Sequence, residues 1–73
     1  MERLSGIVKW FDEKKGFGFI DSEKKDYFVH FREIKNMGFK TLTQGQRVTF
    51  EWSKSDKGLT AKNVLVVSIE GNN

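Results

Sequence analysis

The chain has 73 residues, which is enough for one small domain and too few for two independent cores. It contains no cysteine, so disulfides, thiolate metal sites and cysteine nucleophiles are excluded. His30 is the only histidine and leaves no second imidazole for a metal site or for a catalytic triad. The carboxylates are scattered among lysines, without a paired nucleophile and base. We therefore expect no metal, no other cofactor, no small-molecule substrate and no enzymatic activity.

The charge balance and the aromatic content bear on the partner. Thirteen Lys and Arg residues against ten Asp and Glu residues give a formal charge of +3, which favours a polyanion only mildly. Aromatic residues make up 14% of a chain that is only 37% hydrophobic, and seven residues are Phe. No apolar run approaches the roughly 18 residues of a membrane helix, and no secretory signal pattern is present. We expect a cytoplasmic protein with no membrane partner.

Short runs of Val, Ile, Phe and Trp, separated by Gly, Asp, Lys and Ser, predict five strands. The predicted strands are Leu4–Phe11, Phe17–Ser22, Tyr27–Phe31, Gln46–Ser53 and Leu59–Ser68. The predicted turns are Asp12–Gly16, Glu23–Asp26 and Lys54–Gly58, with a helical turn near Glu33–Met37 followed by a loop. No segment keeps a helical apolar stripe over ten residues. We expect one all-β domain over residues 1–73, a closed antiparallel barrel with its core at about 4–68 and a polar tail at 69–73.

Aromatic residues crowd the second and third predicted strands. Side chains alternate across a sheet, so Phe17 and Phe19 share one face, and Phe28 and His30 share one face of the next strand. If the alternating aliphatic residues point into the core, these four side chains face water. The chain has 17 Val, Ile, Leu, Met and Ala residues, which fill one barrel without them. Exposed aromatics beside lysines are typical of a platform that stacks unpaired bases.

Two kinds of residue flank these aromatics. Gly16 and Gly18 are small enough to allow a close approach by a backbone or a ligand. Lys9, Lys14 and Lys15 could meet phosphates, although acidic residues sit among them. The electrostatic signal is therefore weaker than the aromatic one.

Three segments, Lys9–Phe11, Lys15–Ile20 and Phe28–Phe31, closely resemble the bacterial cold-shock proteins. The likeness extends from Ser5 to about Val66 and includes Gly38–Leu42. The Lys15–Ile20 and Phe28–Phe31 blocks resemble the two RNA-binding motifs of that family, in the same order. This combination is highly specific.

The resemblance implies a five-stranded antiparallel OB-type barrel that binds single-stranded RNA and DNA, preferably pyrimidine-rich. It also implies a monomeric RNA chaperone of the cold stress response, which keeps transcripts unstructured and regulates transcription or translation. Carried over position by position, the binding residues are Lys9, Trp10, Lys15, Phe17, Phe19, Phe28, His30, Phe31, Phe39 and Lys57. Alternation alone would send Phe31 inward, whereas the resemblance places it at the edge of the platform.

The chain departs from the pattern of the cold-shock proteins at several positions. Asp12 stands where Asn is usual, which adds a negative charge beside the platform. Arg32 replaces a small Ser and adds a cation, and Leu59 replaces a Pro whose φ would be fixed. Tyr27 replaces an aliphatic core residue, and the turn before it looks one residue short.

One other interpretation of the aromatic face remains open at this point, and a second is disfavoured. The face could be a protein interface on a small adaptor barrel. The Lys15–Ile20 block also resembles a motif of RRM domains, but such a domain needs two helices, for which this chain has neither the length nor the periodicity.

Overall fold

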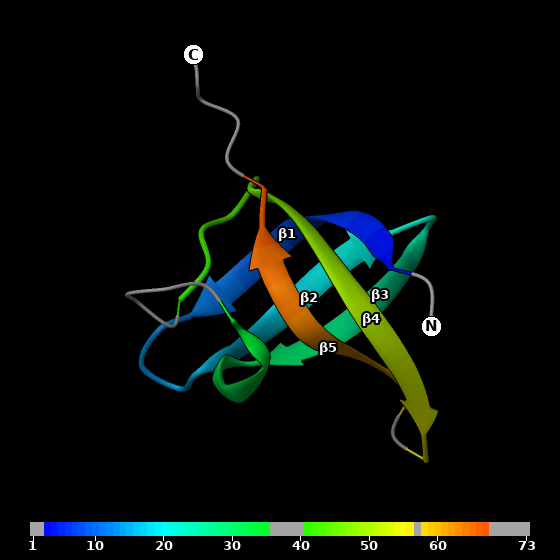
Figure 1. The fold of residues 1–73 in the computed structure, drawn as a ribbon. Helices are drawn as coiled ribbons and strands as arrows, with labels where there is room; N and C mark the ends of the chain where they lie inside the picture. The colour runs from blue at the N-terminus through cyan, green and yellow to red at the C-terminus, as the bar shows by residue number, and fades with distance from the viewer. Residues whose placement is uncertain (1–2, 36–40, 57, 68–73) are drawn as a thin grey trace.

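The computed structural model describes residues 3–35, 41–56 and 58–67, and in these ranges five strands close into one barrel (Figure 1). The elements are β1 (Leu4–Asp12), β2 (Phe17–Ser22), β3 (Lys25–His30), the 3-10 turn η1 (Phe31–Glu33), β4 (Arg47–Ser55) and β5 (Gly58–Val66). No helix in the described ranges is long and apolar enough to cross a membrane. The all-β prediction is confirmed.

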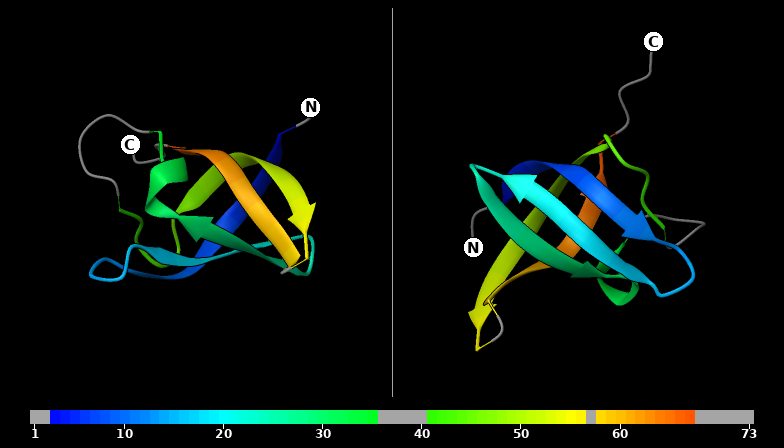
Figure 2. Two further views of the ribbon diagram at one scale, coloured as in Figure 1. Left: turned by 90° about the horizontal axis from the view of Figure 1, so that it is seen from below. Right: turned by 180° about the vertical axis from the view of Figure 1, so that it is seen from behind.

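The strand order around the barrel is β1-β2-β3-β5-β4 (Figure 2). The seams β1–β2, β2–β3, β1–β4 and β4–β5 are antiparallel, but β3 and β5 run parallel, with Phe28 opposite Thr60. The prediction of a closed five-stranded antiparallel barrel is therefore confirmed except at the β3–β5 seam, which is parallel. The reason is the connection after β3, which carries the chain to β4 beside β1, so that β5 returns alongside β3 in the same direction.

The turns are shorter than predicted. Glu23 and Lys24 have φ values of 53° and 67°, and two central residues with positive φ characterise the tightest antiparallel hairpins. The third strand therefore begins at Lys25 rather than at Tyr27. At the β4–β5 hairpin the strands likewise extend to Ser55 and resume at Gly58, inside the predicted turn.

The helical turn begins earlier than predicted. It spans Phe31–Glu33 instead of starting at Glu33, and residues 36 and 37 of the predicted turn lie outside the described residues. The His30 ring caps it, because His30 Nδ1 accepts a hydrogen bond from the Arg32 N–H at 3.2 Å. The turn ends at Ile34, which is fully buried and pairs with Val64.

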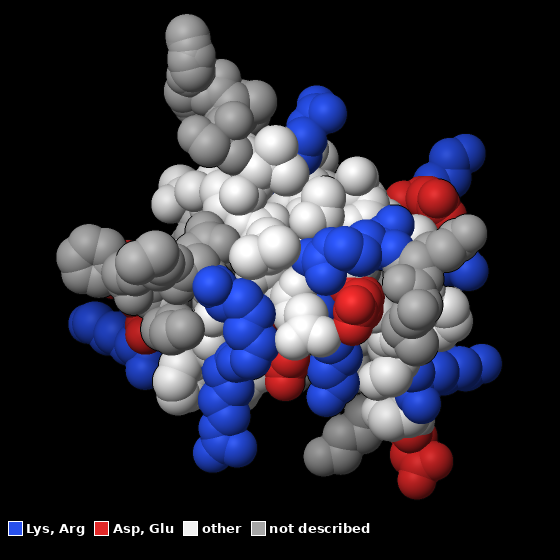
Figure 3. Space-filling model, viewed as in Figure 1, with Lys and Arg blue, Asp and Glu red and all other residues white. Residues whose placement is uncertain are grey.

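A polar network covers the outer face of β4 and β5, which Figure 3 views directly. Its centre is Asn63, a residue with φ 51° at a bulge of β5. The Asn63 N–H donates to Glu33 Oε1 at 3.2 Å, and its side-chain amide donates to Glu51 Oε1 at 2.8 Å. Arg3 donates to the Asn63 carbonyl at 2.7 Å. These bonds join the start of β1, η1, β4 and β5.

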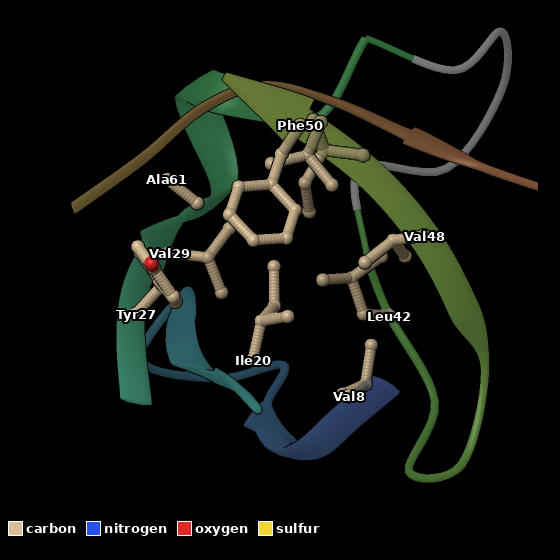
Figure 4. Close-up of a cluster of buried hydrophobic side chains, with 10 residues drawn as sticks. Val8, Ile20, Tyr27, Val29, Leu42, Val48, Phe50 and Ala61 are labelled. Atoms are coloured by element: carbon tan, nitrogen blue, oxygen red, sulfur yellow. The ribbon is translucent and has the colours of Figure 1, made fainter. Parts of the chain in front are cut away.

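The barrel interior is filled mainly by aliphatic side chains. Ten residues form the buried cluster: Val8, Ile20, Tyr27, Val29, Ile34, Leu42, Val48, Phe50, Ala61 and Val64. In Figure 4 the ring of Phe50 lies among these side chains, and its centroid is 5.0 Å from that of Tyr27. Ile20 and Val29 point inward, as the alternation predicts. The outer faces of β2 and β3 are therefore left to Phe17, Phe19 and Phe28.

Candidate nucleic-acid interface

A bulge in β1 brings Trp10 onto the outer face of the barrel. Val8 lies opposite Ile20 and Trp10 lies opposite Phe19, so Lys9 is one extra residue between two successive pairs. Strict alternation would point Trp10 inward with the buried Val8. The extra residue reverses this alternation, as β-bulges do, and Trp10 is 42% exposed.

Four rings form a closed cluster on the outer face of β1, β2 and β3, which faces the viewer in the right panel of Figure 2. We call Trp10, Phe17, Phe19 and Phe28 the aromatic quartet. Trp10 is 6.0 Å from Phe17 and 5.6 Å from Phe19 between ring centroids. Phe28 is 5.7 Å from Phe17 and 5.8 Å from Phe19. The three Phe rings are half-buried, since edge and tilted contacts hold each ring against its neighbours.

A second ring pair extends the quartet toward η1. His30 lies opposite Phe17 across β2 and β3, and its ring centroid is 4.6 Å from that of Phe31. Phe31 is 41% exposed because η1 has already turned the chain out of the strand. The edge position implied by the resemblance is therefore the observed one. We call the quartet and this pair together the aromatic strip.

The fold itself requires the two glycines of the Lys15–Ile20 motif, Gly16 and Gly18. A Cβ on Gly18 would lie 2.7 Å from Phe11 Cα, so the missing side chain allows β1 and β2 to approach at the bulge. Gly16 has φ 80°, and a Cβ there would lie 2.9 Å from the Phe31 ring. Gly16 thus both permits the turn and leaves room for the outermost ring of the strip.

The predicted cationic residues differ in whether a carboxylate of the protein already pairs with them. Lys9 Nζ lies 3.2 Å from Asp26 Oδ1, an exposed ion pair that reaches from β1 to β3. Lys15 is exposed in the turn after β1, next to Lys14. Asp26 was missed from the sequence, because nothing local to residue 26 indicates that it pairs with Lys9. The remaining two predicted binding residues, Phe39 and Lys57, lie outside the described residues.

Asp12 shapes the turn that leads into the strip. Its Oδ1 accepts the backbone N–H groups of Lys14 at 2.9 Å and Lys15 at 3.0 Å, and its carbonyl accepts the Gly16 N–H at 2.7 Å. Asp12 also lies opposite Phe17 in the β1–β2 ladder. The carboxylate is therefore a structural acceptor that places a negative charge at the end of the strip.

Sequence reasoning also missed a groove along one edge of the quartet. Its volume is about 530 Å³, and it is lined by Phe19, Asp26, Phe28, Ser55, Gly58, Leu59 and Thr60. Residues from β4 and β5 reach it because β5 pairs with β3 at Phe28 and Thr60. A parallel pairing between distant strands leaves no local sequence signal.

Comparison with known proteins gives the same family that the two aromatic motifs resemble. Residues 4–67 match the family model described as the 'Cold-shock' DNA-binding domain. Cold shock-like protein CspG of Shewanella violacea is 55% identical over 65 residues, covering 86% of this chain and 93% of that protein. Cold shock-like protein CspE of Escherichia coli K12 is 54% identical over 69 residues, covering 92% of this chain and 100% of that protein.

A solved structure shows the same fold at lower identity. The Drosophila Unr CSD456 structure superposes with a TM-score of 0.77 at 19% identity, covering 99% of this chain. The chain spans 29% of that longer chain, and at this identity the likeness concerns the fold alone. The closed five-stranded barrel is thus of the OB type. With the family model matching most of its length and relatives above 50% identity, the chain belongs to the 'Cold-shock' DNA-binding domain family.

Proposed function

We propose that this chain binds single-stranded RNA and DNA through the aromatic strip and acts as an RNA chaperone in the cytoplasm. The observation that carries the proposal is the set of mutually contacting, partly exposed rings on the outer face of β1, β2 and β3. Bases stack on such rings without regard to sequence, because every base has a π-face. A duplex hides those faces, so the strip favours unpaired strands.

The expected mode of binding rests on the OB-type barrel and on the His30 ring. An OB-type barrel covers about 4 to 8 nucleotides at the lower end of its range, and we expect one strand per monomer. Because His30 Nδ1 accepts the Arg32 N–H, the neutral ring carries its proton on Nε2. An Nε2–H donor can hydrogen-bond a carbonyl oxygen of thymine or uracil, the bases that the resemblance to the family leads us to expect.

The first test compares one RNA in two states. We expect an RNA hairpin that is open about 1% of the time to bind about 100-fold more weakly than an unstructured strand of the same composition. Saturating protein should open the hairpin, because binding the unpaired form alone shifts the equilibrium. A fluorophore and quencher at the two ends report opening, and tryptophan fluorescence reports binding. Equal affinity for the hairpin stem and the unfolded strand would contradict the proposal.

The same samples test the alternative use of the strip as a protein interface. In a sizing experiment without nucleic acid, the proposed function predicts a monomer, and with an oligonucleotide it predicts one protein per short strand. Self-association that persists when the strand is added would favour the protein interface instead, since large exposed aromatic patches also mark such interfaces.

Asp12→Asn should tighten binding about two- to fivefold at low salt, the range of one exposed charge interaction. The amide oxygen can still accept the Lys14 and Lys15 N–H groups, so the turn is retained while the charge opposite Phe17 is removed. The gain should shrink at high salt as screening increases. Oligothymidylate titrations at two salt concentrations measure this, with Glu13→Gln as the control for a charge change in the same turn. Unchanged affinity at low salt would show that the carboxylate does not influence the bound strand.

A further inference from the structure

A second groove continues from the aromatic strip across the β3–β5 seam. It has a volume of about 360 Å³ and is lined by Phe28, His30, Arg32, Glu33, Thr60 and Lys62. Two of these residues, Phe28 and His30, belong to the strip itself. The others come from η1 and β5, so the groove leads directly off one edge of the strip.

The groove exists because the two sides of the seam have unequal lengths. Phe28 pairs with Thr60, and the next bridge joins Ile34 to Val64. There are six positions from Phe28 to Ile34 but only four from Thr60 to Val64. The surplus on the β3 side is taken up by η1, which lifts residues 32 and 33 out of the sheet and opens the seam between the two bridges.

The groove contains two cations, Arg32 and Lys62, and one carboxylate, Glu33, which already has partners within the protein. Arg32 is exposed, and within the described ranges its guanidinium has no ion-pair partner. Lys62 Nζ lies 3.8 Å from Glu33 Oε2, while Glu33 Oε1 accepts the Asn63 N–H. An ammonium group has three donors, so Lys62 can bind Glu33 and a second anion together. Figure 3 shows basic side chains with acidic ones between them on this side of the barrel.

We propose that this groove binds the phosphodiester backbone of a single strand as the strand leaves the aromatic strip, with Arg32 and Lys62 each contacting one phosphate. The inference rests on the proposed function of the strip. The guanidinium of Arg32 is planar and pairs with phosphate through two parallel hydrogen bonds. The Lys62 ammonium supplies a second positive charge from the opposite wall. The rings of Phe28 and His30 stay available to stack the last bases before the backbone enters the groove.

The test measures the salt dependence of binding to a ten-nucleotide oligothymidylate. Each neutralised phosphate contributes about 0.7 to the logarithmic salt slope of a single strand, so Arg32→Gln and Lys62→Gln should each lower the slope by about 0.7. For each lost phosphate contact, the factor by which affinity falls should be about 2.6 times larger at 50 mM salt than at 200 mM salt. Arg47→Gln is the matched control, because it removes the same charge at the β1–β4 seam and should leave the slope unchanged.

Two further measurements separate phosphate contact from structural damage. Lys62→Arg keeps the positive charge and should keep the salt slope. If Lys62 acted only through its ion pair with Glu33, Lys62→Gln would leave the salt slope of the folded protein unchanged. With an oligothymidylate whose linkages are uncharged methylphosphonates, Arg32→Gln and the unaltered protein should bind equally.

The outcomes that overturn the inference are distinct from those that overturn the proposed function. A slope unchanged in the Arg32→Gln/Lys62→Gln double variant, or lowered equally by Arg47→Gln, would refute the groove while leaving the strip intact. Failure of the unaltered protein to bind any oligothymidylate would refute both.

Discussion

Phe28→Ala should weaken binding to an oligothymidylate by about 5- to 150-fold, the equivalent of about 1 to 3 kcal/mol of stacking on one base. Phe28 contacts two other rings of the quartet and lines both grooves beside it, so its removal affects the centre of the interface. Stacking does not release counterions, so the loss should be the same at every salt concentration. Phe17→Ala should behave in the same way.

Lys15→Ala provides the electrostatic contrast. It should lower the logarithmic salt slope by about 0.7 and cost less affinity than Phe28→Ala at physiological salt. Leu65→Ala is the matched control for Phe28→Ala, because it removes an apolar side chain that is 43% exposed on β5, away from the aromatic strip. Titrations at several salt concentrations, followed by the fluorescence of Trp10 and Trp52, distinguish these variants. A Phe28→Ala protein that is unfolded in circular dichroism would show that the ring belongs to the core and would contradict the strip.

Gly18→Ala should lower the free energy of unfolding by about 3 kcal/mol, the upper end of the cost of overpacking. The added Cβ would lie 2.7 Å from Phe11 Cα and 3.0 Å from the Phe11 ring. A backbone atom cannot rotate away as the end of a flexible side chain can, so β1 and β2 must separate. A loss of this size is a large fraction of the stability of so small a domain.

Gly45→Ala is the control for Gly18→Ala. Gly45 has φ 89°, but a Cβ there has no heavy atom within 4 Å, so only the left-handed backbone is penalised, by about 1 to 2 kcal/mol. Thermal and urea unfolding of both variants should therefore rank Gly18→Ala as the more damaging. The reverse order would mean that the close approach of β1 and β2 relaxes at little cost.

Much of the barrel follows from local pattern in the sequence. Ile20 and Val29 alternate with the aromatics of their strands, and period-two alternation determines which residues share a face whatever the strand's neighbours are. The second strand was predicted with its observed bounds, Phe17–Ser22, because a lysine-rich turn precedes it and another follows it. The third was predicted two residues late, because a two-residue turn formed by Glu23 and Lys24 has no glycine or asparagine to indicate it.

Parts of the candidate site obey no local pattern. Trp10 faces outward only because Lys9 is an extra residue in the β1–β2 ladder, and a bulge depends on what the partner strand presents. Phe31 leaves the strand because the His30 ring caps η1 and the buried Ile34 draws the chain back to β5. In both cases the resemblance to the cold-shock proteins predicted the position that alternation by itself did not support.

The amino-acid sequence by itself therefore determined the approximate positions of the strands, the faces of Ile20, Val29 and the Phe residues that alternate with them, and the two aromatic motifs, because each depends on neighbours within a few residues. Only the tertiary structure decided the parallel β3–β5 seam, the Lys9–Asp26 ion pair and the groove that holds Arg32 and Lys62. These features join residues 17 to 32 positions apart along the chain, such as Phe28 and Thr60. Closing the barrel brings such residues together, since it satisfies the unpaired edges of β3 and β5, and no short stretch of sequence records which edges will meet.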